Sequence, residues 1–319
     1  MADDNNAQVV SIIIVTRNTC ALTRAAVQSV LDSGDSLPKE IFVVDNGSSD
    51  ETASTLPREF PQLKFIRSEK NLGFARACNL AAKSAAGEFL LLLNSDARPA
   101  PDALEKAAAW MRANPDCAVA GAQLLNADGS RQNSIANFPT LATELLNKSL
   151  LRRVWPKKFP GKEQVFTAPL DVETIVGAFM FVRKKIWDVL GGLDERFFFF
   201  FEETDFCLRA RRENFHVVHL PEVCAWHGQG QTAKQISAAA RIEYWRSRYI
   251  YFAKNYGVLT RLVLFAGLLV RLFVDWMVAM LFVLVTLGKN ARWRSRFQIC
   301  SALADWHLCG CPPEKGLSR

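Results

Sequence analysis

The sequence predicts an α/β fold in which a mostly parallel sheet is flanked by helices. From Val9 onward, short apolar runs alternate with longer segments of helical periodicity, as in successive β-α-β units. Half of the 319 residues are hydrophobic and 22% are charged. This composition supports a large core and excludes a disordered, collagen-like or coiled-coil chain.

Each predicted strand is a short run rich in Val, Ile, Leu or Phe, and helical segments separate the runs. The run Glu88–Asn94 is almost entirely apolar, so we expect it to be buried on both faces of the sheet. The predicted strands are Val9–Thr16, Ile41–Asp45, Leu63–Arg67, Glu88–Asn94 and Ala118–Leu125, and the predicted helices are Leu22–Leu31, Asp50–Leu56, Ala75–Ala85 and Pro101–Ala113.

Polar residues gather where three of the predicted strands end. Thr16 and Asn18 follow the first strand, Asp45 ends the second, and Ser95 and Asp96 follow the fourth. Taken singly, such residues also serve as turn formers and helix caps. In open α/β sheets, however, ligands bind beyond the carboxyl ends of the strands. The shared position of these side chains therefore favours a nucleotide-binding site.

The chain lacks the common phosphate-binding motifs. It contains no GxxxxGK[ST] loop and no GxGxxG after the first strand, which argues against P-loop enzymes and dinucleotide-dependent enzymes. Asp96 instead lies two residues after a rigid, buried strand, at the rim of the sheet. Mg²⁺ and Mn²⁺ are typically held by one or two carboxylates together with phosphate oxygens. Asp96 therefore indicates a cation that neutralises charge on a leaving diphosphate.

Five blocks of the sequence resemble, in order and spacing, the inverting glycosyltransferase family 2. The fifth block is similar to the rhamnosyltransferase-like branch of that family, and the similarity covers roughly residues 9–257. The blocks are Val10–Asn18, Val43–Asp50, Asn71–Asn79, Leu91–Asp96, and a fifth that runs from Val176–Arg183 through Gly191–Phe198 to Phe201–Arg209.

The resemblance implies a GT-A fold, a nucleotide-sugar donor, a Mg²⁺ or Mn²⁺ ion and sugar transfer with inversion. It puts Asp45 at the nucleobase and Thr16 in the nucleoside pocket, with Asn71 and Asn79 beside the donor sugar. Gly73 would let the backbone approach the ligand. The donor-binding residues that it implies are Thr16, Asn18, Asp45, Asn71, Gly73, Asn79 and Ser95.

The resemblance also implies a cation site. Asp96 matches the ligand of the family's DxD-like motif, whose first Asp is replaced by Asn94 in this chain. His227 matches a family histidine that can complete the site, and neutral imidazole is a competent ligand for Mn²⁺. His216 and His219 lie in a strand-like run, and we expect both to be structural.

Inversion is a one-step displacement, so the protein must supply a general base for the acceptor hydroxyl. The family has this base in a Glu-Asp pair that opens a helix, where this chain has Glu202 and Glu203. We favour Glu203 as the base, with Glu202 as the alternative. Acids in the first turn of a helix over Thr204–Arg212 also suit the helix dipole without any catalysis. The residues expected on the acceptor side are Gly177, Asp194 and Glu195.

The net positive charge of the chain comes from its last quarter. Residues 241–319 carry 12 Lys and Arg against 4 Asp and Glu. Within them, Arg271 and Asp275 interrupt the apolar run Leu262–Gly288, and a basic, Trp-containing segment follows. We expect an interfacial helix or helical hairpin on anionic lipid. A membrane-spanning helix, or a helix buried against the main domain or in a dimer interface, is the alternative. No nucleic-acid partner is expected.

We expect residues 1–257 to form the GT-A domain and residues 258–319 a membrane-associated helical tail. Nucleotide-sugar binding is assigned to about 9–125 and the acceptor and catalytic part to about 126–257. The chain opens without the basic and apolar pattern of a signal peptide, so we expect this end to stay in the compartment where it is made. The sequence leaves the oligomeric state open.

The predicted function is transfer of a single sugar from a nucleotide-sugar donor to a lipid-linked or cell-envelope glycan. We expect the reaction at the cytoplasmic face of the inner membrane, catalysed by a peripheral or monotopic protein. The resemblance favours dTDP-rhamnose as donor, with UDP-hexose or UDP-galactofuranose as alternatives. A non-catalytic glycan- or lipid-binding scaffold that retains the fold is the competing class of function.

Overall fold

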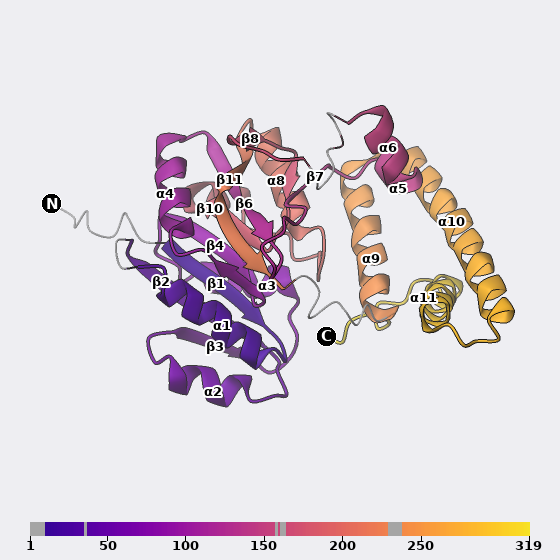
Figure 1. Cartoon of the computed structure of the whole chain (residues 1–319), viewed down its shortest axis with the longest axis horizontal. Helices are drawn as coiled ribbons and strands as arrows, with labels where there is room; N and C mark the ends of the chain where they lie inside the picture. Colours follow the sequence, from indigo (N-terminus) through magenta and orange to yellow (C-terminus); the bar gives the residue numbers. More distant parts are fainter. Residues whose placement is uncertain (1–9, 35–36, 157–158, 160–163, 229–237) are drawn as a thin grey trace. The chain divides into compact units, whose positions relative to one another are not determined.

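The computed structural model describes residues 10–34, 37–156, 159, 164–228 and 238–319 (Figure 1). They form two compact units. The first comprises the described residues of Met1–Phe138, Pro160–Phe198 and Glu202–Thr232, and the second those of Pro139–Phe159, Phe199–Phe201 and Ala233–Arg319.

A nine-stranded sheet forms the centre of the first unit. Its strands are β1 (Val10–Thr16), β2 (Lys39–Asn46), β3 (Lys64–Ser68), β4 (Phe89–Asn94), β5 (Ala97–Pro99), β6 (Cys117–Leu125), β8 (Leu170–Asp171), β10 (Phe179–Arg183) and β11 (His216–His227). Their order is β3-β2-β1-β4-β10-β6-β11-β5, and β8 pairs with β11 outside this path. A separate ladder joins β7 (Ile135–Ala136) to β9 (Thr174–Ile175).

The sheet is parallel where the sequence predicted parallel strands. β1 pairs in parallel with β2 and β4, and β2 with β3. β10 was not among the predicted strands and runs antiparallel between β4 and β6. Its hydrophobic run, like those of its neighbours, carries no signal for strand direction. The predicted α/β architecture, a central sheet flanked by helices, is therefore confirmed.

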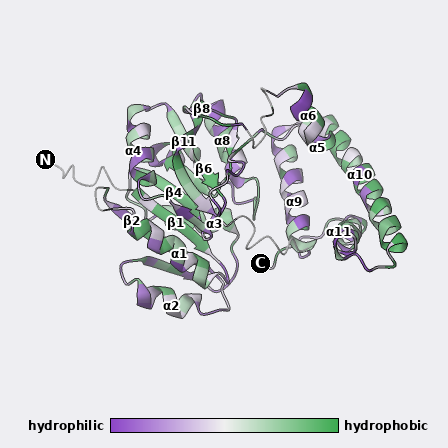
Figure 2. Ribbon diagram, in the orientation of Figure 1, coloured by the Kyte–Doolittle hydropathy of each residue, from purple (hydrophilic) through white to green (hydrophobic). Residues whose placement is uncertain are grey.

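Helices cover both faces of this sheet (Figures 1 and 2). On one face, Ile12 and Ile14 of β1 lie in a hydrophobic cluster with residues of α1, α2 and α4, whereas Ile13 joins a second cluster with α3, α7 and α8. Because both faces are covered, the central strands are apolar throughout. These helices are α1 (Cys20–Leu31), α2 (Thr52–Glu59), α3 (Phe74–Ala82), α4 (Ala103–Ala113), α7 (Lys184–Leu190) and α8 (Glu202–Arg212).

The predicted helix Asp50–Leu56 begins two residues later than expected. Asp50 lies before it, and its carboxylate accepts hydrogen bonds from the backbone N–H groups of Thr52 (3.1 Å) and Cys20 (3.2 Å). These residues begin α2 and α1. One carboxylate thus satisfies free N–H groups at the start of two helices, which fixes the loops beside the strand ends.

His216 and His219, the two histidines at the start of β11, differ in environment. His216 is exposed and its Nδ1 lies 3.1 Å from Asp171 Oδ1. His219 is 1% exposed, and burial lowers its pKa to about 4. His219 is therefore neutral at physiological pH and part of the core.

Helices make up the second unit: α5 (Leu141–Leu145), α6 (Lys148–Val154), α9 (Ala238–Asn255), α10 (Val258–Val285) and α11 (Ala291–Leu308). α11 returns along α10 as a helical hairpin, since Trp293 stacks on Phe282 with ring centroids 4.2 Å apart and Trp276 Nε1 donates to Ser301 Oγ (2.9 Å). α9 joins them through Tyr249, whose hydroxyl lies 2.9 Å from His307 Nε2. The predicted boundary after residue 257 differs from this grouping, because α9 belongs to the same unit as α10 and α11.

Among the described residues, α10 is long and apolar enough to cross a membrane by length and composition. Its most apolar window has a mean hydropathy of 2.3, and 17% of that window is buried. Figure 2 shows α10 as a largely hydrophobic helix. A large apolar surface of this helix is therefore uncovered within the chain.

Candidate functional site

The strand ends of β1, β2 and β4 bring three of the predicted donor-binding residues to one edge of the sheet. Thr16 and Asp45 are register partners of neighbouring strands. Thr16 Oγ1 lies 3.0 Å from Thr19 Oγ1, and Thr19 Oγ1 in turn donates to Ser95 Oγ (3.3 Å). Thr16, Asp45 and Ser95 therefore belong to one connected polar edge.

Asp45 is a buried carboxylate with one oxygen that no described residue contacts by a hydrogen bond. Its side chain is fully buried; Oδ1 accepts from Ser48 N–H (3.0 Å), whereas Oδ2 is inaccessible to solvent and has no hydrogen-bond partner. A buried acceptor without a donor costs about 1–3 kcal/mol, more when it is charged. Oδ2 is thus a buried acceptor that the described residues leave unsatisfied.

Asn18 joins the two loops that follow β1 and β2. Its Oδ1 accepts from Ser49 N–H (2.7 Å), and its backbone N–H donates to Ser48 Oγ (3.0 Å). Asn18 has a φ of 54°, a left-handed conformation that Asn adopts more readily than most residues. Its side chain therefore joins the loop after β2 to the loop after β1, beside the polar edge of the sheet.

Asn71 and Gly73 are held by a residue that the sequence analysis missed. Asn46 donates from Nδ2 to Asn71 Oδ1 (2.9 Å) and accepts at Oδ1 from Leu72 N–H (2.7 Å). Asn46 directly follows Asp45 at the end of a predicted strand, and this position could have identified it from the sequence.

Gly73 is needed for a reason other than the expected approach to a ligand. Its φ is +82°, and a Cβ there would lie 2.5 Å from the backbone oxygen of Phe198. The same oxygen accepts from Phe74 N–H (2.8 Å). The close approach that the structure records at Gly73 is therefore between two segments of the protein.

Asp96 and His227 face each other, as the sequence predicted for two ligands of one cation. β5 pairs with β11 so that His227 lies opposite Ala97, and Asp96 Oδ1 is 3.4 Å from His227 Nε2. Both side chains are largely buried, at 6% and 12% exposure. Donor atoms of two ligands on one octahedral ion lie about 3 Å apart. The carboxylate and the imidazole are therefore close enough together to act as ligands of one ion.

Protein ligands alone do not complete a metal site here. Among the described residues, no three His, Cys, Asp or Glu side chains are gathered so that they could hold an ion. A cation bound by Asp96 and His227 would need further oxygen ligands from a bound molecule, as Mg²⁺ commonly has from substrate phosphates.

Glu202 and Glu203 open α8 as predicted, but in different environments. Glu202 is 7% exposed, its Oε2 has no hydrogen-bond partner among the described residues, and burial followed by the charge of Glu203 raises its pKa well above the usual range. Glu203 is half-buried, and burial raises its pKa as well. A Cβ on Gly177 would lie 3.4 Å from Glu203 Cγ, so Gly177 lines the Glu203 side chain. Glu203 is the more accessible carboxylate.

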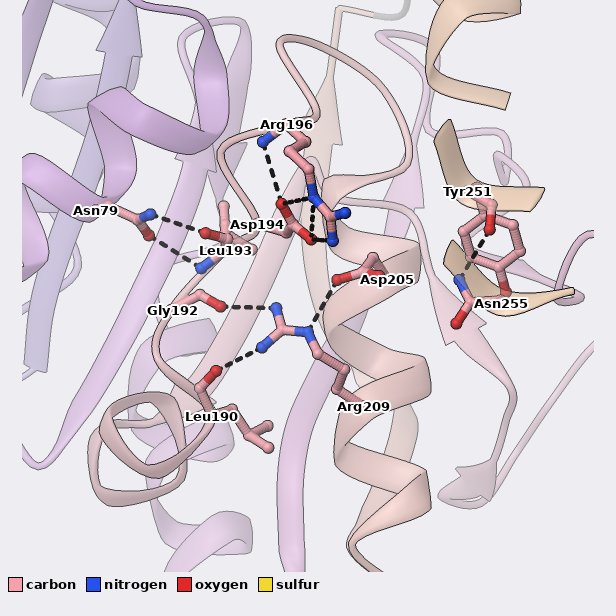
Figure 3. A network of polar contacts seen from close by, with 10 residues as sticks. All are labelled: Asn79, Leu190, Gly192, Leu193, Asp194, Arg196, Asp205, Arg209, Tyr251 and Asn255. Atoms are coloured by element: carbon pink, nitrogen blue, oxygen red, sulfur yellow. Dashed lines mark hydrogen bonds and ion pairs between the residues drawn. The ribbon is translucent and has the colours of Figure 1, made fainter. Parts of the chain in front are cut away.

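Arg209 fixes the loop before this helix (Figure 3). Its guanidinium donates to Asp205 Oδ2 (2.8 Å) and to the backbone oxygens of Leu190 (2.6 Å) and Gly192 (2.7 Å). Asp205 is fully buried. The sequence analysis assigned no role to Asp205 or Arg209, although their spacing of four residues is that of an ion pair on a helix.

Asn79 has its amide group engaged by the same loop rather than left open for a sugar. Its Nδ2 donates to Leu193 O (2.8 Å) and its Oδ1 accepts from Leu193 N–H (2.9 Å), as Figure 3 shows. Asp194 is paired with Arg196 (2.6 Å), and Glu195 is 3.4 Å from Arg76. Arg209 and Asn79 therefore hold residues 190–193, the segment directly before both predicted acceptor-side acids.

Comparisons with known proteins identify the family and the fold. The model of the family described as "Glycosyl transferase family 2" matches residues 11–191. The chain belongs to glycosyl transferase family 2. The family 2 match covers β1 to α7, which includes the polar edge formed by Thr16, Asp45 and Ser95.

Characterised relatives of this family 2 glycosyltransferase act in glycan biosynthesis. The N-acetylglucosaminyl-diphospho-decaprenol L-rhamnosyltransferase of Mycobacterium tuberculosis is 23% identical over 69% of this chain and 76% of its own length. The low-salt glycan biosynthesis hexosyltransferase Agl10 of Haloferax volcanii is 26% identical over 66% of each protein. The predicted resemblance and the predicted enzyme class are both confirmed.

Solved structures share the fold. The mannosyltransferase PcManGT from Pyrobaculum calidifontis, in complex with GDP-Man and Mn²⁺, aligns over 96% of this chain and 88% of its own with a TM-score of 0.57 and 17% identity. TarS residues 1–349 of S. aureus, in complex with UDP, align over 78% of this chain and 66% of theirs with a TM-score of 0.51 and 18% identity. The predicted GT-A-like fold is thereby confirmed.

Two adjacent glycines of the acceptor-side loop provide a test of the Asn79 contact. Gly191 and Gly192 have φ values of +74° and +73°, so an alanine costs about 1–2 kcal/mol of backbone strain at either. A Cβ at Gly192 would lie 2.6 Å from Asn79 Oδ1, whereas one at Gly191 meets nothing within 4 Å. We expect Gly192→Ala to lower the free energy of unfolding by about 1–2 kcal/mol more than Gly191→Ala, because it also displaces the Asn79 amide.

Urea unfolding of both variants and of Asn79→Ala measures this difference. Once Asn79 is replaced by Ala, most of this difference should disappear, and the part that remains reflects the contact of a Gly192 Cβ with Trp187 at 3.3 Å. Equal costs in the presence of Asn79 would mean that this amide does not hold the loop.

Proposed function

We propose that this glycosyltransferase moves one sugar, with inversion, from a nucleotide-sugar donor to a lipid-linked or cell-envelope glycan. The observation that carries the proposal is the position of three groups in one unit: the unsatisfied Asp45 Oδ2, the facing pair Asp96 and His227, and the accessible Glu203. They supply, in turn, a nucleoside contact, a cation site and a general base. Rhamnose from dTDP-rhamnose is the first candidate sugar, and the rhamnosyltransferase relative from Mycobacterium tuberculosis supports it.

The donor nucleotide would bind at the edge formed by Thr16, Asp45 and Ser95. Asp45 Oδ2 would accept a hydrogen bond from the nucleobase, which removes the cost of leaving this oxygen buried and unpaired. A UDP-hexose or UDP-galactofuranose donor is the alternative to dTDP-rhamnose, and the bound nucleotides of the structural relatives, GDP-Man and UDP, leave the base open.

Asp96 and His227 would hold Mn²⁺ or Mg²⁺ together with the donor diphosphate. When bound, the cation stabilises negative charge on the leaving nucleoside diphosphate. Glu203 would take the proton of the acceptor hydroxyl as its oxygen bonds to the anomeric carbon and the bond from that carbon to the diphosphate breaks. Burial of Glu203 raises its pKa, which makes the carboxylate a stronger base at neutral pH.

The uncovered face of α10 supports a membrane surface as the place of reaction. Exposed apolar side chains run along the helix, among them Leu262, Phe273 and Leu281. Two charged residues lie in the middle of α10. Asp275 pairs with Arg296 of α11 (2.6 Å), and Arg271 donates to Glu144 O (3.0 Å). Such groups are costly in the hydrocarbon core, so we propose that α10 lies along the bilayer surface on the cytoplasmic side.

A non-catalytic scaffold is the competing proposal, because Asn94 and Glu203 depart from the family pattern. Turnover separates the two. A scaffold would bind nucleotide or glycan without releasing nucleoside diphosphate, whereas an enzyme releases it in a reaction that depends on Glu203.

The cation site is tested by the binding of dTDP, UDP and GDP. We expect one nucleotide to bind more tightly with Mn²⁺ than without it, and Asp96→Asn to weaken binding in Mn²⁺ at least about tenfold, equal to about 1.4 kcal/mol. Isothermal titration calorimetry measures both, with Asp116→Asn, which removes an exposed carboxylate, as matched control. Failure of all three nucleotides to bind, or wild-type affinity in Asp96→Asn, would contradict the proposed donor site.

The choice of base is tested by the neighbouring glutamates. We expect Glu203→Gln to lower kcat about 100- to 10,000-fold while nucleotide affinity stays the same, and Glu202→Gln to lower it less than about tenfold. In the wild type, kcat should fall as the pH drops through the raised pKa of Glu203, because only the ionised base accepts a proton. Release of nucleoside diphosphate measures the rate. A larger loss in Glu202→Gln would assign the base to Glu202.

Membrane docking is tested with vesicles of anionic or neutral lipid. We expect the protein to sediment with anionic vesicles and less at high salt, and the double variant Arg292→Glu, Arg294→Glu to lose about tenfold or more in affinity. These arginines are exposed at the start of α11. The matched control is Lys83→Glu, Lys185→Glu, which reverses two exposed charges of the first unit. Equal loss in both variants, or equal binding to neutral vesicles, would contradict a docking surface on the helical hairpin.

A further inference from the structure

The imidazole of His227 is held from behind by a buried amide. Its Nδ1 lies 3.0 Å from Oε1 of Gln132, on the ring side opposite the nitrogen that faces Asp96. Gln132 is 5% exposed, so water does not compete for this contact. A buried amide beside one ring nitrogen can determine which nitrogen carries the proton.

The other contacts of Gln132 fix the orientation of its amide group. Its Nε2 is surrounded by oxygens: His227 O at 2.7 Å, Asn126 Oδ1 at 2.9 Å and Leu125 O at 3.3 Å. A flipped amide would place its oxygen against backbone carbonyls that can only accept. Oε1 must therefore face His227, and because Oε1 is only an acceptor, Nδ1 of His227 must carry the hydrogen.

We infer that Gln132 is a positioning residue that keeps His227 in the Nδ1–H tautomer. A neutral imidazole with its hydrogen on Nδ1 has its lone pair on Nε2, and Nε2 is the nitrogen 3.4 Å from Asp96 Oδ1. The amide thus prepares His227 as a ligand before any cation binds. The inference deepens the proposed function, since it rests on the cation site of Asp96 and His227.

The local fold explains how Gln132 reaches this place. The chain leaves β6 at Leu125 and reverses in a tight turn, in which Asn126 N–H donates to Ser130 O (2.8 Å) and Gly129 has a φ of +79°. The Asp128-Gly129 pair suits such a turn. Gln132 N–H then donates to Leu124 O (2.8 Å), next to the residues of β6 that pair with β11. The turn therefore returns the chain to the end of the strand that carries His227.

The tautomer can be measured directly in the cation-free protein. In protein labelled with ¹⁵N-histidine, two-dimensional spectra that correlate ring protons with ring nitrogens distinguish the protonated from the unprotonated nitrogen, and His227→Asn assigns the signals among the four histidines. We expect wild-type His227 to have a protonated Nδ1 and an unprotonated Nε2. A protonated Nε2 in the neutral wild-type ring would overturn the inference without any variant.

Two substitutions separate the hydrogen bond from the packing of the side chain. Gln132→Met keeps the length but removes the acceptor, so we expect Nε2–H to become populated. Gln132→Glu keeps an acceptor for Nδ1–H while losing the amide donors, and it should retain the Nδ1–H tautomer. An unchanged tautomer in folded Gln132→Met would overturn the proposed role.

Cation affinity supplies the second readout. We expect Gln132→Met to weaken Mn²⁺ binding in the presence of the nucleoside diphosphate roughly 10- to 100-fold, measured as free Mn²⁺ by electron paramagnetic resonance. Gln62→Met, at an exposed position, should leave it unchanged. Wild-type affinity in Gln132→Met would overturn the positioning role, whereas a wild-type protein that binds no Mn²⁺ would overturn the proposed cation site and leave the tautomer result standing.

Discussion

The site depends first on the parallel register of β1, β2 and β4. Register partners at the carboxyl ends of these strands are Thr16 with Asp45 and Val15 with Asn94, so the residues that follow each strand emerge at one edge. A shift of one residue in either pairing would turn alternate side chains to the opposite face. In the observed register Ile12 and Ile14 pack in one cluster and Ile13 in the other, so a shift would disrupt close packing on both faces. Core packing on both faces therefore fixes the chemistry at the edge.

Beyond the strands, side-chain amides hold the site together. Asn46, Asn79 and Gln132 are each at a junction between segments distant in sequence, and each uses both its oxygen and its nitrogen. An amide can donate and accept at once without a charge, so it can join two backbones in a buried place at little electrostatic cost. Arg209 does the same with a charge, which the buried Asp205 balances. These contacts bring residues of the loops into fixed positions that the sheet alone does not determine.

The sequence alone predicted the elements that are marked by a local pattern of residues. Apolar runs and helical periodicity predicted β1 to β4, β6 and α1 to α4, and polar strand ends predicted Thr16, Asp45, Ser95 and Asp96 at one edge. Long-range contacts carry no such signal. Nothing in the periodicity of Phe179–Arg183 indicates that it inserts antiparallel between β4 and β6, or that Gly73 meets the backbone of Phe198. The grouping of α9 with the tail helices also depends on contacts between residues far apart, such as Tyr249 with His307.

The same reasoning explains why two adjacent glutamates that look equivalent in sequence are not equivalent in the fold. Consecutive residues on a helix point about 100° apart, so when α8 packs against the sheet one of them must face the protein interior. Glu202 takes that position and is almost fully buried, while Glu203 lies beside Gly177, where the absence of a side chain leaves room. A buried acid that is protonated cannot take a proton from an acceptor, and a buried anion next to a second one is costly. Burial and the charge of Glu203 both raise the pKa of Glu202, so Glu203 is the carboxylate that ionises more readily and is more accessible. Burial of Glu202 in this way supports the proposed role of Glu203 as the base, because a charged Glu202 would raise the pKa of Glu203 further.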